Sequence, residues 1–423
     1  MHLARLLFLL LAFFCNDVLS QLPFTSFNTS IIPITKDAKT SLYKITWSGW
    51  RGQPYYLIDL DAPFTWKECK VYLPKVACGF EECQLPLQCD GYYCVIARSY
   101  VNPICPSLNM AAKYGCDVCA VTPVNPVSNS CKISQLTTDL ISLTATDGRN
   151  PSTGTFENIR FVFSCAPSSL MRSLPKDVGG VAAFSWSSLG FPSQVAFGNL
   201  VEKFALCLPS SSMAPGVTFI GNGPFYLLPF PNLDVRSFLS YTPMLRKTSE
   251  SLGYYITINR ISIKGTPISL PLLKTSPVKL STIVTYTTLR SDIYKALVTS
   301  FAKATKKIPR VNPVQPFSFC LKASAIGSIK VGFHVPKIDL EMGSGKKWII
   351  SGDNSMKRIG NGAACLAFID GGLRVKDAIV IGTFQMENNF LFLDLVNQRL
   401  GFSSSLLARG TSCSSFNFTA ISE

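Results

Sequence analysis

Short hydrophobic runs, broken by Gly, Pro, Asn and Ser, recur along most of the chain. Runs rich in β-branched and aromatic residues between such breakers are typical of strands. The clearest strands are expected at 55–60, 159–163, 254–258, 348–350, 378–382, 390–394 and 400–402. One helix is expected over 291–298, where Ser291 can cap the N-terminus and the apolar side chains share one face. The pattern predicts a mostly β protein with few short helices, too long for a single sandwich.

The length and a faint long repeat indicate two lobes. A chain of 423 residues is long enough for two or three domains. One strand near residue 59 and another near residue 281 each open a half, and the segment 216–231, rich in Gly, Pro and aromatic residues, lacks a helical period. We therefore expect an N-terminal lobe over 21–215 and a C-terminal lobe over 216–423.

The first twenty residues have the pattern of a secretory signal peptide. Arg5 precedes an apolar run over 6–14, and Val18-Leu19-Ser20 offers a small-residue exit, with cleavage expected before Gln21. The apolar run is too short to span a bilayer, and no later run of about 18 apolar residues follows it. The sequence therefore predicts a secreted protein without a transmembrane span.

Cysteine content agrees with an oxidising compartment. Removal of Cys15 with the signal leaves an even number of cysteines, enough for up to seven disulfides, and they crowd most densely between Cys69 and Cys131. A zinc site at Cys116 and Cys119 is the alternative for one CxxC pair. Glycosylation sequons are present at two further positions, Asn28 and Asn417.

Charge and histidine content narrow the function classes. Forty Lys and Arg residues against 25 Asp and Glu give a formal charge of +15, which attracts acidic partners such as an acidic cell-wall polysaccharide or an acidic protein. The basic residues are scattered and no nucleic-acid motif is present, which argues against nucleic acid. With only His2 and His334 in the chain, a histidine-built metal site is nearly excluded, and no metal or cofactor is expected.

The C-terminal run 379–402 resembles the closing strands of pepsin-like aspartic proteinases, which implies a bilobal pepsin-like fold. Those enzymes use two aspartates that share a proton, one from each lobe, each in Asp-Thr/Ser-Gly. Here the first triplet is Asp59-Leu60-Asp61, and the second, aligned by the resemblance, is Ser281-Thr282-Ile283. The second carboxylate is absent. We therefore expect no proteolysis, with Asp59 a strand residue and Ser281 at a degenerate catalytic position.

A narrower resemblance is to the plant group of xylanase inhibitors, xyloglucanase-inhibiting proteins, the extracellular dermal glycoprotein and basic 7S globulins. The segments that carry it are 58–66, 78–83, 122–127, 163–167, 191–194, 204–208 and 413–419. The chain departs from the group at the turn over 180–186 and in having two cysteines more than the twelve expected. The resemblance implies disulfides Cys207–Cys413 and Cys320–Cys365.

The same resemblance implies a catalytically inactive scaffold that inhibits microbial cell-wall-degrading glycoside hydrolases, of the endoglucanase, xyloglucanase or xylanase type, in plant defence. Such enzymes have two carboxylates in an open cleft, and an arginine pairs well with carboxylates. Two loops, 306–313 and 404–413, match positions that inhibitors of the group use, which makes Arg310 and Arg409 the candidate binding residues; the alternative for both is a solvated loop charge. The expected location is the apoplast or cell wall. A basic seed-globulin-like storage or peptide-binding protein is the alternative function, and a residual aspartic endopeptidase a remote one.

Overall fold

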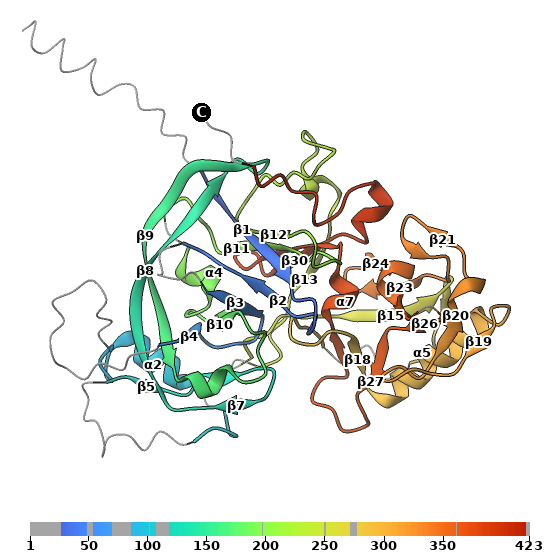
Figure 1. Cartoon of the computed structure of the whole chain (residues 1–423), viewed down its shortest axis with the longest axis horizontal. Helices are drawn as coiled ribbons and strands as arrows, with labels where there is room; N and C mark the ends of the chain where they lie inside the picture. The colour runs from blue at the N-terminus through green and yellow to red at the C-terminus, as the bar shows by residue number, and fades with distance from the viewer. Residues whose placement is uncertain are drawn as a thin grey trace, which may run out of the picture.

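The computed structural model describes residues 27–48, 54–69, 86–100, 102–106, 118–196, 198–248, 251–270, 277–360 and 362–419. The expected signal peptide over 1–20 lies outside these residues. No helix in the described ranges is long and apolar enough to cross a bilayer. The architecture is mostly β, as expected from the sequence, with two halves side by side (Figure 1).

One large sheet dominates the N-terminal half. Its strands, in spatial order, are β13 (Ser240–Pro243), β30 (Arg399–Phe402), β29 (Phe390–Asp394), β11 (Lys203–Cys207), β12 (Gly216–Gly221), β1 (Thr29–Lys36), β2 (Tyr43–Ile45), β3 (Tyr55–Asp59), β10 (Val178–Ala183), β4 (Trp66–Glu68), β9 (Pro151–Ala166), β8 (Ser134–Thr146) and β5 (Ala120–Val121). β11 pairs with both β12 and β29, so the sheet runs across the expected lobe boundary at residue 216. The division into lobes at that residue remains a prediction.

Three smaller sheets build most of the C-terminal half. The first contains β14 (Tyr255–Ile256), β17 (Val278–Leu280), β28 (Ile379–Ile381), β18 (Thr287–Leu289) and β27 (Phe368–Asp370). The second contains β16 (Thr266–Pro267), β15 (Ile258–Ile263), β23 (Ile338–Met342) and β24 (Lys347–Ile350). The third contains β19 (Arg310–Val311), β20 (Cys320–Lys322), β26 (Ala363–Leu366) and β25 (Met356–Ile359). Two hairpins complete the set: β6 (Val124–Asn125) with β7 (Ser130–Cys131), and β21 (Ser328–Ile329) with β22 (Gly332–Phe333).

Helices in the described ranges are few. They are α2 (Tyr92–Ser99), α4 (Phe191–Gln194), α5 (Ser291–Ala304), α6 (Gly352–Ser355) and α7 (Thr383–Met386), with 3-10 turns η1 (Ser168–Met171), η2 (Val235–Phe238), η4 (Ala323–Ala325) and η5 (Leu406–Arg409). The expected helix at 291–298 is confirmed and is longer than expected, because Phe301 continues its buried face. The expected cap is wrong: Ser291 is already helical, and its hydroxyl donates to Asp370. The expected strand at 254–258 is split at Thr257, since β14 pairs with β17 whereas β15 pairs with β23.

The same strand-pairing pattern occurs once in each half. β10 pairs in parallel with β3 and antiparallel with β4, and β4 pairs in parallel with β9. In the C-terminal half β28 pairs in parallel with β17 and antiparallel with β18, and β18 pairs in parallel with β27. This is the internal repeat that the sequence showed only faintly.

Disulfides join distant parts of the chain. Cys207–Cys413 ties β11 to the C-terminal tail, and Cys320–Cys365 joins β20 to β26; both are the pairings that the resemblance implies. Cys69–Cys165, Cys94–Cys119 and Cys105–Cys131 are also formed. Because Cys119 is in a disulfide, it has no thiolate for the zinc alternative.

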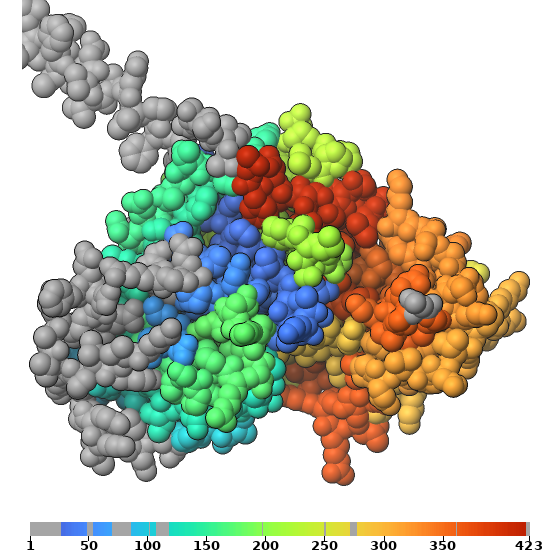
Figure 2. Space-filling model, in the orientation of Figure 1, coloured from blue at the N-terminus to red at the C-terminus, as the bar shows by residue number. Residues whose placement is uncertain are grey.

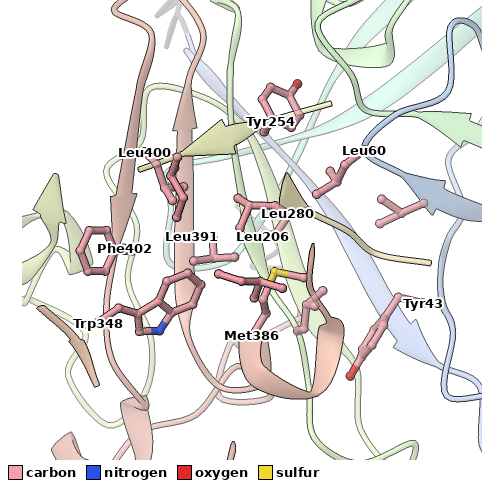
Figure 3. Packing of buried hydrophobic residues seen from close by; sticks show 14 of the residues in the cluster. Tyr43, Leu60, Leu206, Tyr254, Leu280, Trp348, Met386, Leu391, Leu400 and Phe402 are labelled. Atoms are coloured by element: carbon pink, nitrogen blue, oxygen red, sulfur yellow. The ribbon is translucent and has the colours of Figure 1, made fainter. Parts of the chain in front are cut away.

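The main core lies where the halves meet. Figure 3 shows Leu60, Leu206, Leu280, Met386 and Leu391 packed together; they come from strands, from α7 and from the loop after β3. All five are buried. Burial of apolar side chains between the halves therefore fixes the position of the loops that follow β3 and β17.

Candidate functional site

The repeat places Asp59 and Ser281 at corresponding positions. Asp59 ends β3 and Ser281 directly follows β17, the strand that corresponds to β3. Six residues after Asp59, the Thr65 hydroxyl accepts a hydrogen bond of 3.1 Å from the N–H of Ala183, the residue opposite Asp59. Six residues after Ser281, the Thr287 hydroxyl accepts one of 3.1 Å from the N–H of Gly382. The two loops thus share one hydrogen-bond pattern and differ at the residue that corresponds to Asp59, which is Ser281 in the second loop.

Asp59 is a buried carboxyl group. It is 7% exposed, and burial, helped by the neighbouring charge of Asp61, raises its pKa to about 7. The backbone N–H of Asp61 donates to Asp59 Oδ1 at 2.9 Å and opposes that rise, as does the charge of Lys279. In a mildly acidic medium Asp59 is therefore mostly a neutral carboxylic acid.

Asp61 forms an ion pair with Lys279, a residue that the sequence analysis did not single out. Lys279 lies in β17, so the pair joins the two halves. Burial lowers the pKa of Lys279, but the carboxylate of Asp61, its hydrogen bond and the nearby Asp59 raise it overall. Gly253 packs against this pair: a Cβ on Gly253 would come within 2.9 Å of Asp61 Oδ1. The pair lies 218 residues apart in sequence, so no local pattern could have revealed it.

The loop after β17 also donates a hydrogen bond to the end of β3. The Thr282 hydroxyl donates to the carbonyl oxygen of Ile58 at 2.6 Å. Leu60, the corresponding residue of the first loop, has no hydroxyl and instead packs into the core beside Leu280 (Figure 3). The Ser281 hydroxyl accepts from the N–H groups of Ile283 and Val284 at 3.2 and 3.3 Å. Ser281 thus stabilises its own turn.

The chemistry open to this arrangement is limited. The loop after β17 places a hydroxyl, and no carboxylate, at the position that corresponds to Asp59. Within the described ranges, no cluster of three His, Cys, Asp or Glu side chains could hold a metal ion. A shared-proton pair of carboxylates requires two acidic groups at this place.

Arg310 lies on the surface of the C-terminal half. Its guanidinium carbon is 4.9 Å from the centre of the Phe319 ring, a cation–π contact. β19, which begins with Arg310, pairs with β20, and the Cys320–Cys365 disulfide fastens β20 to β26. Lys306, Lys307 and Lys322 are exposed as well, and among the described residues none of these four cations has a carboxylate within ion-pair distance. The loop therefore presents a fixed arginine among free positive charges.

Arg409 lies in a different part of the molecule. It ends η5, its guanidinium carbon is 4.1 Å from the centre of the Phe238 ring, and Gly410 follows with φ of 79°. Figure 1 shows β19 at the right tip, whereas the dark-red segment that contains the residues after β30 lies near the top. Figure 2 shows the same separation on the surface. The two arginines thus lie in separate regions of the surface, and each stacks on a different aromatic ring.

The two sequons differ in their surroundings. Asn28 is exposed, but Ser30, the third residue of its sequon, is fully buried in β1. Asn417 is half-buried, and its Oδ1 accepts from the N–H of the exposed Thr419 at 3.1 Å.

Family models and known proteins match this chain over most of its length. The model of the xylanase inhibitor N-terminal region matches residues 49–222, and that of the C-terminal region matches residues 253–404. Chitinase CLP of Oryza sativa subsp. japonica is 37% identical over 403 residues, which cover 92% of this chain and 91% of that protein. Gamma conglutin 1 of Prunus dulcis is 38% identical over 337 residues, covering 78% and 77%.

A solved structure has the same architecture. The crystal structure of edgp superposes with a TM-score of 0.83 at 32% identity, covering 94% of this chain and 100% of that one. Together with the family matches, this similarity confirms the fold expected from the sequence.

Proposed function

This chain belongs to the xylanase inhibitor family, and from that premise we propose that it is a secreted, catalytically inactive protein that binds and inhibits a microbial cell-wall-degrading glycoside hydrolase. The observation that carries the proposal is the exposed Arg310, which stacks on Phe319 near exposed lysines that form no ion pair with any carboxylate the structure describes. The proposed place of action is the plant apoplast or cell wall.

Loss of catalysis follows from the loops after β3 and β17. In this proposal Ser281 replaces the second aspartate of a pepsin-like site, so Asp59 has no partner with which to share a proton. Leu60 and Asp61 replace the residues that would complete the first site, and the ion pair between Asp61 and Lys279 occupies the space beside Asp59. Without an acidic group at the position of Ser281, a protonated Asp59 cannot activate water as the paired carboxyls of an aspartic proteinase do.

Binding to a glycosidase relies on the Arg310 loop at the tip of the C-terminal half. A glycosidase cleft has two carboxylates at its floor, and a guanidinium pairs with carboxylates through parallel hydrogen bonds. The stacking of Arg310 on Phe319 and the disulfide-fastened β20 reduce the conformational entropy that the loop loses on binding. Arg409 makes a second contact only if the partner is large enough to reach both the tip and η5.

The net charge of +15 has a separate role, because it accelerates encounter with an acidic partner without adding contacts. An acidic cell-wall polysaccharide is attracted by the same charge. Added salt therefore slows association, whereas the lifetime of the complex depends on contacts such as that of Arg310.

The proposal is tested with immobilised protein and fungal culture filtrate. Captured proteins are identified by mass spectrometry, and the hydrolase is then measured by surface plasmon resonance against wild type, Arg310→Ala and the control Arg160→Ala, an exposed arginine on β9. Arg310→Ala should weaken binding by about 2–5 kcal/mol, mainly by faster dissociation, because a buried carboxylate of the partner loses its cation. Equal kinetics for Arg310→Ala and wild type would contradict this role of Arg310.

A storage or peptide-binding role is the second candidate, favoured by the similarity to Gamma conglutin 1 of Prunus dulcis. It predicts abundant deposition in seed and no inhibition of any hydrolase. Peptidase and chitinase assays of the purified protein test the remaining enzyme alternatives, the second because of the similarity to Chitinase CLP.

A further inference from the structure

A surface groove of about 500 Å³ lies in the C-terminal half, and neither Asp59 nor Arg310 lines it. Its apolar wall comes from the β21–β22 hairpin and the segment after it, with Ile329, Val331 and Phe333 among the lining residues. Three nitrogen-bearing side chains, Lys264, His334 and Lys337, also line it. The volume is within the range of small-molecule binding sites, which combine apolar walls with a few polar groups.

The fold brings the two lysines of the groove together. Lys264 and Gly265 form the two-residue turn between β15 and β16, with φ of 52° and 77°. The left-handed φ is unfavourable for a lysine; Asn or Gly is the usual residue at this position of such turns. The backbone N–H of Lys264 donates to the carbonyl oxygen of Lys337 at 3.0 Å, which fixes the turn against the strand segment that precedes β23. Two lysine side chains therefore start from adjoining backbone at the mouth of one groove.

The basic side chains of the groove are available to a ligand. Among the described residues, no carboxylate forms an ion pair with Lys264, His334 or Lys337. All three side chains are exposed, so an incoming anion meets free donors. An anion bound at these lysines gains charge-assisted hydrogen bonds.

We propose that this groove binds a small amphipathic carboxylate, an aliphatic or aromatic acid whose apolar body lies on the exposed Ile329 and the adjoining surface of Val331 and Phe333, and whose carboxylate meets Lys264 and Lys337. The apolar wall and the lysines select for both parts of such a ligand. An apolar molecule without charge leaves the lysines unpaired, and an inorganic anion leaves the apolar wall wet. The proposal is independent of glycosidase inhibition, because the groove shares no lining residue with the Arg310 loop.

The test is isothermal titration calorimetry of the full mature chain with decanoate and 4-phenylbutyrate, each compared with its neutral alcohol, 1-decanol or 4-phenylbutanol. Wild type should bind at least one of the acids saturably at a one-to-one ratio, and the matching alcohol at least about tenfold more weakly. The double variant Lys264→Gln, Lys337→Gln should weaken binding of that acid by about tenfold or more. The control Lys295→Gln, Lys303→Gln removes the same charge from the exposed face of α5 and should bind as wild type does.

Each alternative result overturns the proposal. Absence of saturable binding by both acids refutes the site, and equal affinity for acid and alcohol refutes recognition of the carboxylate. Equal loss in the two double variants means that net charge alone attracts the acids. Thermal unfolding of each variant at the wild-type temperature establishes that the lysine substitutions leave the fold intact, as expected for exposed side chains.

Discussion

The buried carboxyl of Asp59 makes the stability of this protein depend on pH in a direction opposite to that of an ion-paired aspartate. Its pKa rises to about 7 in the folded protein, because of burial and the neighbouring Asp61, against about 3.9 in an unfolded chain. Between these values the folded state binds more protons than the unfolded state. The stabilising contribution of the protonated group is complete below about pH 4 and is lost as the pH rises through 7.

The size of the effect follows from the shift. Three pKa units at 1.36 kcal/mol each correspond to about 4 kcal/mol lost between pH 4 and pH 8. Asp59→Asn removes this loss and keeps an oxygen that can accept from the N–H of Asp61. The variant should therefore match wild type near pH 4 and exceed its free energy of unfolding by about 4 kcal/mol near pH 8.

The assay is equilibrium unfolding in urea at several pH values from 4 to 8, with disulfides intact. The difference between wild type and variant isolates Asp59, because Glu387 and Asp353, whose pKa values burial also raises, are present in both proteins. Asp370→Asn is a control of opposite sign: hydrogen bonds from Ser291 and Gly372 lower the pKa of Asp370, so its contribution is lost as the pH falls. A stability difference between wild type and the Asp59→Asn variant that stays constant across the pH range would refute the reasoning.

Three further perturbations test the packing and the loss of catalysis. Leu60→Ala should lower the free energy of unfolding by about 2–5 kcal/mol, since the side chain is 1% exposed in the core between the halves; a change below about 1 kcal/mol would contradict that packing. Ser281→Asp should remain inactive on casein at acid pH, because Leu60 and Asp61 still occupy the first site; pepstatin-sensitive cleavage by this variant would contradict the expectation. Cleavage by wild type that Asp59→Asn abolishes would overturn the loss of catalysis itself. The double variant Cys320→Ser, Cys365→Ser should lose about 2–4 kcal/mol of stability, measured by urea unfolding, and dissociate faster from a hydrolase; unchanged dissociation would show that the disulfide does not rigidify the Arg310 loop.

The sequence predicts elements that local pattern determines. The β-branched and aromatic residues of β3 and the apolar runs of β28 and β29 reveal strands, and the buried face of α5 reveals a helix. Resemblance adds the pepsin-like fold, because the closing strands keep their family pattern. These features depend on residues that are neighbours in the chain.

Long-range features escape such reasoning. The ion pair of Asp61 with Lys279 and the hydrogen bond of Thr282 with Ile58 join residues more than 200 positions apart. Glu387 is likewise buried against Lys36 and Tyr43 from the other end of the chain. The groove at Lys264 and Lys337 arises only once a hairpin turn meets a distant strand. Each depends on tertiary contacts that no local motif encodes.

Inhibition of a glycoside hydrolase is tested most directly by titrating purified xylanase, xyloglucanase and endoglucanase of microbial origin with this protein. The account predicts that one of these enzymes loses activity linearly with added protein until one equivalent is present, and that Arg310→Ala weakens this inhibition while Arg160→Ala does not. Full activity of all three enzymes at a tenfold molar excess of the protein would contradict it.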